Sequence, residues 1–321
     1  MSGAPVRIVV IGAGHMGRLH AQKLAALHEA GEGVTLAGVA DVERSRAEEV
    51  ARPLGVAAVA RARDLFASAD AAIVAVPTID HYAVVSEALA GGLDVLIEKP
   101  IAATLRDAEE LLAHAKSAGR VLQVGHLERF NGAMRRVAGL VCRPRFIEAH
   151  RLGPFPARAT DVDVVRDLMI HDLDLIQGFL HEEPSRVESI GVPVLTRNVD
   201  IANARLTFPS GCVANLTASR VSPTPMRKLR LFQPDGYISI DFLAQSAVVF
   251  RRFEQPGREE PRIEMEKLEI DREDALLEEL RAFAASVRAR STPSVSGEEA
   301  LSALRTALRV IEAMPPLDAL R

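Results

Sequence analysis

The sequence predicts an α/β protein, with an N-terminal Rossmann dinucleotide-binding domain followed by an α+β domain that has a mostly antiparallel, open sheet. Residues 1–125 alternate nearly continuous apolar runs with amphipathic segments, which is typical of parallel strands joined by helices. After Gly125, strand-like runs follow one another with turn signals between them, which is typical of antiparallel sheet. We therefore expect two domains, 1–125 and 126–321, with a C-terminal helix at 297–314 that could pack back on the first.

The first domain should consist of repeated strand–helix units. Three of its helices are followed by a glycine, which readily adopts the left-handed conformation that ends many helices: Gly31, Gly91 and Gly119. The expected strands are 7–11, 35–40, 71–76, 95–98 and 121–124, and the expected helices are 15–30, 43–52, 80–90 and 104–118.

The second domain should be built mainly from hairpins. Pro209-Ser210-Gly211 and Pro234-Asp235-Gly236 are tight-turn sequences between alternating segments. One helix, 162–180, should interrupt the strands, and two more should end the chain, at 272–289 and 297–314. The expected strands are 146–151, 187–194, 202–208, 212–220, 228–233, 237–242, 247–253 and 262–270.

The composition indicates a globular protein from a reducing compartment. Of the 321 residues, 48% are hydrophobic and 26% are charged, so the chain can bury the cores of two domains. A net charge of −4 without a basic stripe argues against a nucleic-acid partner. Cys142 and Cys212 provide no disulfide framework, and residues 1–7 do not resemble a signal peptide. Because no apolar run is long enough for a membrane span, we expect a cytoplasmic protein without a membrane partner.

A glycine-rich turn follows the first expected strand. Gly12, Gly14 and Gly17 have G-x-G-x-x-G spacing, and His15 and Met16 begin the following helix. The first glycine allows a tight turn, the second lets the backbone approach a pyrophosphate, and the third permits close packing of the helix on the strand. Because the motif lies between a strand and a helix N-terminus, which favours anions, it predicts a dinucleotide site.

The predicted cofactor is NAD, with NADP less favoured. Asp41 follows the second strand, where its carboxylate can accept the ribose 2′-hydroxyl and would repel a 2′-phosphate. Arg44 could stack on adenine, pair with a phosphate, or lie in a solvated helical turn. Pro77 and Thr78 follow another strand on the same edge and are candidate cofactor contacts. His81 joins these candidates, although the start of a helix suits it better than catalysis.

The tripeptide Glu98-Lys99-Pro100 ends the fourth expected strand. Ligands of open parallel sheets bind at this carboxyl edge. The proline biases Lys99 toward an extended backbone. In isolation such a lysine could simply solvate a strand end, but beside a bound cofactor it can be catalytic. We therefore predict Lys99 as a catalytic residue, and both Glu98 and Lys99 as contacts of the cofactor.

A polar face is expected on the helix of the second domain. Asp167, His171 and Asp174 are spaced i, i+4 and i+7, so they should share one side. A carboxylate one turn before a histidine can fix its tautomer and stabilise its protonated form, as a general base requires. A solvated polar face and a metal site of two carboxylates and one histidine are the alternatives. Because a nicotinamide enzyme does not need a metal, we predict acid/base chemistry and no metal.

These motifs, in this order along the chain, resemble those of the glucose–fructose oxidoreductase/inositol dehydrogenase/MocA (Gfo/Idh/MocA) oxidoreductase family, and the resemblance covers essentially all residues. It implies a Rossmann domain and a second domain whose open sheet face mediates dimers or tetramers. It also implies that Lys99 and His171 flank the substrate carbon beside the nicotinamide, with Asp167 supporting the histidine. The motifs that carry it are Gly12-x-Gly14-x-x-Gly17, Glu98-Lys99-Pro100 and Asp167-x3-His171-x2-Asp174.

Two further segments, 125–131 and 161–172, are similar to the subgroup of UDP-N-acetylglucosamine 3-dehydrogenases. Those enzymes oxidise the sugar 3-hydroxyl to a ketone, which an aminotransferase then converts to an amine on the route to amide-linked lipid A. The chain departs from the subgroup at Gly132, where proline is usual, and at Arg166, where an apolar residue is usual. Both departures lie near the expected sugar pocket and leave the substrate open.

The expected function is NAD-dependent oxidation of a secondary hydroxyl of a sugar or sugar nucleotide, with Lys99, Asp167 and His171 also contacting the substrate. Arg129 and Asn131, just beyond the last Rossmann strand, are candidates for further substrate contacts or for an ordinary surface role. Two alternatives stay open: an inositol or monosaccharide dehydrogenase, and a non-catalytic dinucleotide-binding sensor.

The second sheet should also form a subunit interface. Two of its expected strands, 228–233 and 247–253, carry apolar residues on both faces, and a sheet covered by helix on one side would leave some of them bare. We therefore expect a homodimer or homotetramer. The residues concerned are Leu229, Leu231, Val248, Val249 and Phe250.

Overall fold

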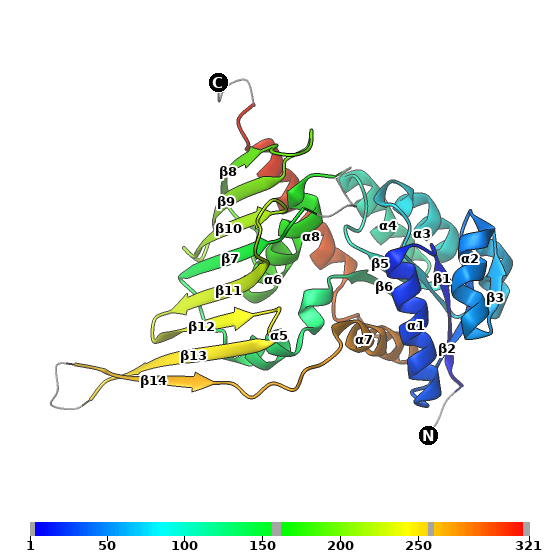
Figure 1. Cartoon of the computed structure of the whole chain (residues 1–321), viewed down its shortest axis with the longest axis horizontal. Helices are drawn as coiled ribbons and strands as arrows, with labels where there is room; N and C mark the ends of the chain where they lie inside the picture. Colours follow the sequence, from blue (N-terminus) through cyan, green and yellow to red (C-terminus); the bar gives the residue numbers. More distant parts are fainter. Residues whose placement is uncertain (1–3, 156–161, 256–259, 317–321) are drawn as a thin grey trace. The chain divides into compact units, whose positions relative to one another are not determined.

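The computed structural model describes residues 4–155, 162–255 and 260–316 of the chain (Figure 1). The chain forms two compact units: unit 1 is Met1–Leu127 with Asp274–Leu301, and unit 2 is Glu128–Glu273 with Ser302–Arg321. This division differs from the single boundary expected at 125/126. The C-terminal part is shared, because α7 (Ala275–Ala289) belongs to unit 1 whereas α8 (Gly297–Glu312) begins in unit 1 and ends in unit 2.

Unit 1 contains a six-stranded parallel sheet with the strand order β3-β2-β1-β4-β5-β6 (Figure 1). From β1 the chain adds β2 and β3 on one side, and then adds β4, β5 and β6 on the other side of β1. The strand order therefore reverses between β1 and β4, which is where open α/β sheets bind dinucleotides. The five expected strands are present, and a sixth, β3, was missed because three residues are too few to show a period. The strands are β1 (Val6–Ile11), β2 (Val34–Ala40), β3 (Ala57–Val59), β4 (Ala71–Val74), β5 (Asp94–Glu98) and β6 (Leu122–Gly125).

Helices cover both faces of this sheet. All residues of β4 and the first four of β5 are buried, and successive side chains of a strand point to opposite faces. Leu280 and Phe283 of α7 join the core formed by β1 and α1, which explains why this late helix belongs to unit 1. The other helices are α1 (His15–Glu29), α2 (Arg44–Ala51), α3 (His81–Ala90) and α4 (Leu105–Ser117), with the 3-10 turns η1 (Arg52–Leu54), η2 (Ala62–Ser68) and η3 (Thr78–Asp80).

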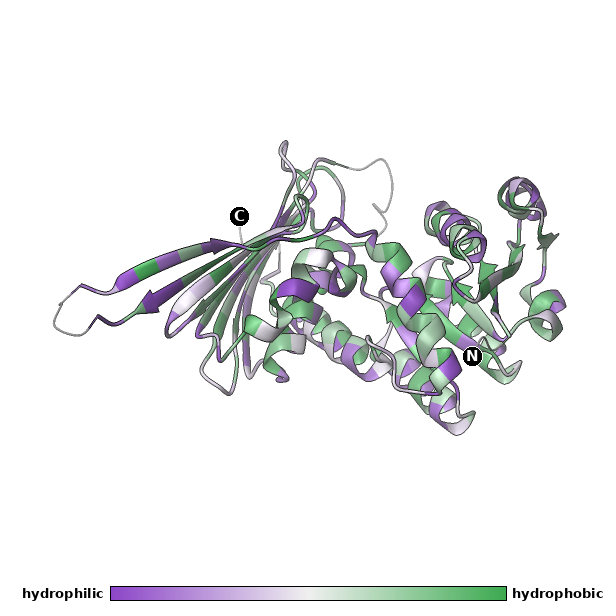
Figure 2. Ribbon diagram, turned by 90° about the horizontal axis from the view of Figure 1, so that it is seen from below, coloured by the Kyte–Doolittle hydropathy of each residue, from purple (hydrophilic) through white to green (hydrophobic). Residues whose placement is uncertain are grey.

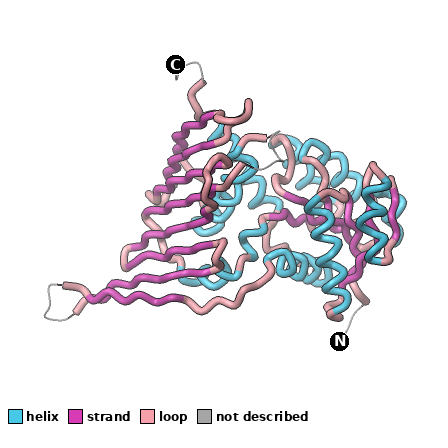
Figure 3. Tube along the Cα trace, in the orientation of Figure 1, coloured by secondary structure: helices cyan, strands magenta, loops and turns pink. Residues whose placement is uncertain are grey.

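Unit 2 contains an eight-stranded sheet with the order β14-β13-β12-β11-β7-β10-β9-β8 (Figure 3). Neighbouring strands are antiparallel except for the parallel pair β7 and β10, so the expected mostly antiparallel sheet is confirmed. The strands are β7 (Phe146–Leu152), β8 (Arg186–Val192), β9 (Ile201–Thr207), β10 (Val213–Ser219), β11 (Met226–Gln233), β12 (Gly236–Asp241), β13 (Ser246–Phe253) and β14 (Arg262–Lys267).

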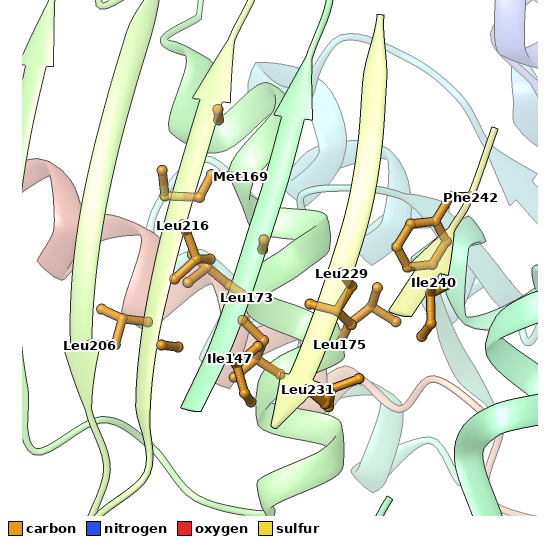
Figure 4. Close-up of a cluster of buried hydrophobic side chains, with 14 of the residues drawn as sticks. Ile147, Met169, Leu173, Leu175, Leu206, Leu216, Leu229, Leu231, Ile240 and Phe242 are labelled. Atoms are coloured by element: carbon orange, nitrogen blue, oxygen red, sulfur yellow. The ribbon is translucent and has the colours of Figure 1, made fainter. Parts of the chain in front are cut away.

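The core of unit 2 lies between one face of this sheet and a helical layer. Burial alternates along β9, as expected for a strand with one covered face. Figure 4 shows Met169 and Leu173 of the helical layer beside Ile147, Leu216 and Leu229 of the sheet. The elements of this layer are η4 (Leu127–Phe130), α5 (Gly132–Val137), η5 (Ala138–Leu140), a π-helical turn η6 (Val165–Met169) and α6 (Ile170–Leu180), with the second part of α8.

The other face of the sheet carries a row of aromatic side chains. Phe146, Phe232, Tyr237 and Phe250 occupy paired positions on β7, β11, β12 and β13, with ring centroids 5.6, 5.3 and 4.3 Å apart along the row. The described helices of unit 2 pack against the opposite face, where the core lies, and Figure 2 shows the sheet with helices beside it. Met265 of β14 continues the row and is 67% exposed. One apolar row therefore crosses five strands of the open face, beside charged residues such as Arg230 and Glu148, which form an ion pair at 2.5 Å.

This face differs in detail from the sequence expectation. Leu229, Leu231 and Val249 are only 0%, 0% and 5% exposed, because they belong to the core under the helices. Val248 and Phe250 alternate with these residues and lie on the other face. The expected apolar surface is present, but it is formed mainly by aromatic residues.

Candidate functional site

The glycine turn of unit 1 provides a backbone cradle at the end of β1. Gly12 has φ of +97°, and a Cβ atom there would lie 2.5 Å from the Ala75 carbonyl oxygen, so only glycine fits. A Cβ on Gly17 would lie 1.7 Å from the Gly12 carbonyl oxygen. At Gly14, by contrast, nothing lies within 4 Å of the position of a Cβ atom. The two outer glycines therefore shape the turn, while the middle one leaves open space in front of the N-terminus of α1.

Asp41 lies directly beside this cradle. Its carboxylate accepts a hydrogen bond from the backbone N–H of Ala13, in the turn, at 2.8 Å, and another from the N–H of Glu43 at 2.9 Å. The side chain is half-buried, so a ligand in the cradle can reach it. The structure thus brings Asp41 and the glycine turn together, as the motif requires.

Two exposed apolar residues on the same edge were missed by the sequence analysis. Val42 follows β2 and is 92% exposed, and Ile79 follows β4 and is 78% exposed. Apolar side chains at strand ends that flank a dinucleotide cradle suit the faces of an aromatic base. The signal that could have identified them is a bulky apolar residue in the otherwise polar segment after a strand: Val42 lies two residues after β2, and Ile79 lies in η3, five residues after β4.

The remaining cofactor candidates of unit 1 differ in accessibility. His15 and Pro77 are exposed, and Met16 and Thr78 are half-buried, so all four can contact a ligand at this edge. Arg44 is 69% exposed and pairs with Glu48 one turn later at 2.9 Å, which matches a solvated helical turn. Contact between any of these residues and the cofactor remains a prediction.

His81 lies beneath the edge and not on it. It is 1% exposed, with Nδ1 2.9 Å from the Pro100 carbonyl oxygen and Nε2 3.0 Å from the Val76 carbonyl oxygen. Burial lowers the pKa of His81. The contacts with backbone carbonyls and the negative charge of the nearby Glu98 act in the opposite direction but only partly offset the effect of burial. Each ring nitrogen faces a backbone carbonyl oxygen, and the single N–H of the neutral imidazole can donate to one of the two. His81 therefore supports the loops that follow β4 and β5.

Lys99 follows β5 at the same carboxyl edge and is half-buried. The peptide bond between Lys99 and Pro100 is cis. The side chain of the preceding Glu98 is 15% exposed, and its Oε1 accepts a hydrogen bond from His20 Nε2 at 2.7 Å. Burial opposes ionisation of Glu98, but the hydrogen bond and charge of His20, together with Lys99 and His81, hold the pKa of Glu98 below its usual value.

In unit 2, the helix that carries Asp167 and His171 begins with a π-helical turn. Asp163 accepts hydrogen bonds from the N–H groups of Val165 and Arg166 at 3.0 and 2.9 Å, and Arg166 Nε lies 2.6 Å from its other carboxylate oxygen. The polar Arg166, which departs from the subgroup pattern, is thus bound to the start of its own helix. Isolated π turns within helices are frequent at functional sites.

Asp167 and His171 lie on the accessible side of an otherwise buried helix. Between positions 163 and 177, only Arg166, Asp167, Leu168 and His171 retain partial exposure. The prediction that Asp174 shares this side was wrong, because Asp174 is 2% exposed and pairs with Arg129 at 2.7 Å. The accessible polar side chains of this segment are therefore Asp167, His171 and Arg166, and Arg166 is paired with Asp163.

Arginines neutralise the other carboxylates of α6. Asp172 lies 2.8 Å from Arg151, just as Asp174 pairs with Arg129. Buried carboxylates matched by guanidinium groups stabilise packing and are not available to a cation. Among the residues that the structure describes, no group of three or more histidine, cysteine, aspartate or glutamate side chains is arranged for a metal ion.

Arg129 and Asn131, the additional substrate candidates, make internal contacts. Arg129 is 18% exposed and binds both carboxylate oxygens of Asp174. Asn131 caps α5, because its Oδ1 accepts a hydrogen bond from the Ala133 N–H at 3.1 Å while its Nδ2 donates to the Phe242 carbonyl at 3.2 Å. These bonds give both residues structural roles, and contact with substrate remains a prediction.

Gly132 follows this cap. A Cβ atom there would lie 3.0 Å from the Asp271 carbonyl oxygen, so any side chain, proline included, would force the backbone near Asp271 to move. Packing within unit 2 therefore accounts for the glycine at a position where the subgroup usually has proline.

Comparison with known proteins agrees with both units. Residues 6–126 match the Gfo/Idh/MocA oxidoreductase family with an NAD-binding Rossmann fold, and residues 132–239 match the Gfo/Idh/MocA C-terminal domain. The chain is 38% identical to UDP-N-acetylglucosamine 3-dehydrogenase from Acidithiobacillus ferrooxidans, over 95% of this chain and 96% of that protein. A crystal structure of that dehydrogenase has a TM-score of 0.89 at 37% identity, covering 97% of this chain and 98% of the other.

More distant relatives include enzymes named for inositols. Myo-inositol 2-dehydrogenase from Thermotoga maritima is 27% identical over 93% of this chain and 93% of that protein. Apo scyllo-inositol dehydrogenase from Lactobacillus casei has a TM-score of 0.80 at 22% identity, covering 98% and 97% of the two chains, and so shares the fold.

Proposed function

Because the chain belongs to the Gfo/Idh/MocA oxidoreductase family, we propose that it is an NAD-dependent dehydrogenase that oxidises a secondary hydroxyl of a sugar nucleotide to a ketone. The observation that carries this proposal is 38% identity to a UDP-N-acetylglucosamine 3-dehydrogenase over 95% of the chain. The 3-hydroxyl of UDP-N-acetylglucosamine is accordingly the proposed site of oxidation. A place on the route to lipid A follows only if this substrate is correct.

The residues of unit 1 fit a nicotinamide dinucleotide. The open space at Gly14, in front of the N-terminus of α1, suits a pyrophosphate. Asp41, fixed beside the turn, would accept ribose hydroxyls and repel a 2′-phosphate, which favours NAD over NADP. Val42 and Ile79 offer apolar surface to the adenine. When bound, the nicotinamide ring accepts the hydride from the substrate carbon.

Lys99 and His171 would handle the proton of the reacting hydroxyl. The Lys99 ammonium donates a hydrogen bond to the oxygen, which stabilises the negative charge that develops on this oxygen as its proton leaves. The imidazole of His171 takes the hydroxyl proton, directly or through Lys99. Asp167, one helical turn before His171, favours the protonated imidazole that results. No metal is needed, because the lysine and the imidazole supply the required charge and base.

An inositol or monosaccharide dehydrogenase is the second candidate function. It is favoured by the relationship to myo-inositol 2-dehydrogenase at 27% identity over 93% of the chain. A non-catalytic dinucleotide sensor is disfavoured, because an acid/base lysine and histidine have no evident use in a protein that only binds the cofactor. The two dehydrogenase functions, on a sugar nucleotide or on an inositol or monosaccharide, use the same cofactor cradle and differ only in substrate.

We also propose that the chain functions as a homo-oligomer in the cytoplasm. The aromatic row of Phe146, Phe232, Tyr237 and Phe250 supports assembly through the open face of the unit 2 sheet, because apolar surface of this kind is normally covered. Both cysteines are free thiols, as expected in a reducing compartment. No helix among the described residues is long and apolar enough to span a membrane.

A substrate panel tests the proposal. Purified protein with NAD is mixed separately with UDP-N-acetylglucosamine, other UDP-sugars, free monosaccharides and inositols, and formation of reduced nicotinamide is followed by absorbance. We expect the highest kcat/KM with UDP-N-acetylglucosamine. Higher kcat/KM with an inositol would favour the second candidate, and cofactor binding without turnover of any substrate would favour a sensor.

A further inference from the structure

Two buried histidines contact the residues on either side of Lys99, one through a side chain and one through the backbone. His20, from α1, is 0% exposed, and His81, from α3, is 1% exposed. The proposed reaction uses neither side chain. His20 Nδ1 has no hydrogen-bond partner among the described residues, so its contact through Nε2, like the contacts of His81, indicates what the buried ring does.

His20 fixes the residue before Lys99. Its Nε2 lies 2.7 Å from Oε1 of Glu98, the last residue of β5. On its other side, Oε2 of Glu98 lies 3.3 Å from the place where a Cβ of Gly125 would be, so the carboxylate packs directly over this glycine of the neighbouring β6. The Glu98 side chain is thus held from one helix and one strand.

His81 fixes the residue after Lys99. Its Nδ1 lies 2.9 Å from the carbonyl oxygen of Pro100, and its Nε2 lies 3.0 Å from the carbonyl oxygen of Val76, just beyond β4. The imidazole therefore joins the loop after β5 to the loop after β4. Lys99 lies between two anchored neighbours.

A second buried carboxylate shows which group beneath this edge carries the charge. Glu279 of α7 is 1% exposed, and its Oε1 has no hydrogen-bond partner among the described residues. Burial, followed by repulsion from Glu98, raises the pKa of Glu279 well above its usual value. Burial thus favours the neutral form of Glu279, whereas the contact with His20 favours the ionised form of Glu98. The bond from His20 to Glu98 is a charge-assisted one, which makes it a firm anchor.

We propose that His20 and His81 are positioning residues that hold Lys99 in place for the transfer of the substrate proton, an inference that rests on the proposed function because it takes Lys99 to be the group that acts. The helices involved also serve the cofactor site. α1 begins at the glycine turn, and α3 follows Pro77 and Thr78 through η3. The cofactor cradle and the lysine backbone are thus held by the same two helices.

Paired substitutions separate the anchoring bond from simple packing. Glutamine at position 20 can place an amide N–H near the Nε2 position, and asparagine at position 81 can place one near Nδ1. We expect His20→Leu and His81→Leu to lower kcat about 10- to 100-fold, since small displacements of a catalytic group have effects of this size. We expect His20→Gln and His81→Asn to retain most of the wild-type kcat. The Kd for NAD should be unchanged in all four variants.

His28 provides a matched control. It lies on the same helix as His20, and its Nδ1 is 3.1 Å from the Val34 carbonyl oxygen, but it has no contact with the β5 edge. Because His28 is exposed, His28→Leu should leave kcat unchanged and should change Tm less than His20→Leu does. If it lowered kcat as much as His20→Leu, a general disturbance of α1 would explain the result and the proposal would be overturned.

A double-mutant cycle tests whether the histidines act through Lys99. In a Lys99→Ala background, His20→Leu and His81→Leu should lower kcat no further, because the group that they position is gone. Independent, multiplicative losses would overturn the proposal. Full activity of Lys99→Ala itself would instead overturn the proposed function.

Chemical labelling gives a readout that needs no substrate. In the presence of NAD, the rate of Lys99 acylation by a small amine-reactive reagent is measured by peptide mass spectrometry, with Lys23 and Lys116 of the same unit as references. We expect His20→Leu and His81→Leu to change the Lys99 rate several-fold and to leave the reference rates unchanged. An unchanged Lys99 rate would overturn the positioning role, even if the substrate proved to be different.

Discussion

In the sheet of unit 1 every residue of β4 is buried, whereas in the sheet of unit 2 burial alternates from residue to residue along β9. The first sheet is covered on both faces, so only the ends of its strands can meet a ligand, and the cofactor candidates accordingly lie at one edge. The second sheet is covered on one face only. Its helical layer carries Asp167 and His171, and its other face carries the row of aromatic side chains. The way each sheet is buried therefore determines where function can be placed.

The largest expected effect comes from removing one reactive group from each unit. We expect Lys99→Ala and His171→Ala each to lower kcat by about 10²–10⁴-fold, the usual contribution of a positioned acid or base. The Kd for NAD should change little, because neither residue belongs to the cradle around Gly14. Asp167→Asn should cost less, since it disturbs the imidazole without deleting it. Turnover and cofactor titration of each variant provide the measurement.

Near-full turnover of His171→Ala on the identified substrate would contradict this assignment. The polar side of the helix would then be an ordinary solvated surface, and only unit 1 would supply groups for the reaction. A large loss of NAD affinity in Lys99→Ala would show that the lysine holds the cofactor and has no separate part in the chemistry.

A second test concerns the bare face of the unit 2 sheet. Replacing Tyr237 and Phe250 together by arginine places two charges in the aromatic row, so we expect the wild-type oligomer to dissociate. Phe253→Arg is the control: it lies on the same strand, is 43% exposed, and alternates onto the other face. Light scattering at micromolar concentration measures the mass. A monomeric wild type would rule out an interface here.

A smaller effect is expected from Asp41, at the edge of the unit 1 sheet. Asp41→Ala removes both the acceptor for ribose hydroxyls and the charge that repels a 2′-phosphate. We expect NAD affinity to fall about tenfold, in line with the loss of one or two hydrogen bonds to a charged group, while relative use of NADP improves. Asp64→Ala, which removes a surface partner of Arg61, is the control. Equal loss for both cofactors would show that Asp41 does not discriminate between them.

The smallest expected effect tests the buried carboxylates of unit 1. The pKa of Glu279 is well above 4.5 in the folded chain and ordinary in the unfolded chain. Between these values the folded state binds more protons, so stability falls as pH rises. Glu279→Gln removes this dependence. The difference obtained by subtracting the Tm of the wild type from the Tm of Glu279→Gln should therefore increase by a few degrees from about pH 5 to about pH 8. A constant difference would mean that folded Glu279 is ionised.

Much of this architecture could be predicted because its signals are local. Continuous apolar runs identified five strands of unit 1, and glycines within a strand–turn–helix context identified the cradle. The division of the chain into two units was harder to predict, because α7 has the amphipathic pattern of any surface helix. Its assignment to unit 1 depends on long-range packing of Leu280 and Phe283 against β1 and α1.

The ionic contacts of the site could not be predicted from spacing. Asp167 and Asp174 look equivalent around His171 in the sequence, but only a folded chain places Arg129 against Asp174. The buried histidines were hidden for the same reason: His20 and Glu98 are bonded across 78 positions, and no local period links them. The π-helical turn likewise has no sequence pattern that separates it from an α-helix.

Transfer of a labelled hydrogen tests the central claim most directly. UDP-N-acetylglucosamine carrying deuterium at carbon 3 is incubated with the protein and NAD, and the reduced cofactor is analysed by mass spectrometry. Oxidation of the 3-hydroxyl predicts that each reduced nicotinamide formed carries one deuterium. Unlabelled reduced cofactor would place the oxidation at another carbon, and the absence of any reduced cofactor with this sugar nucleotide would contradict the proposed function.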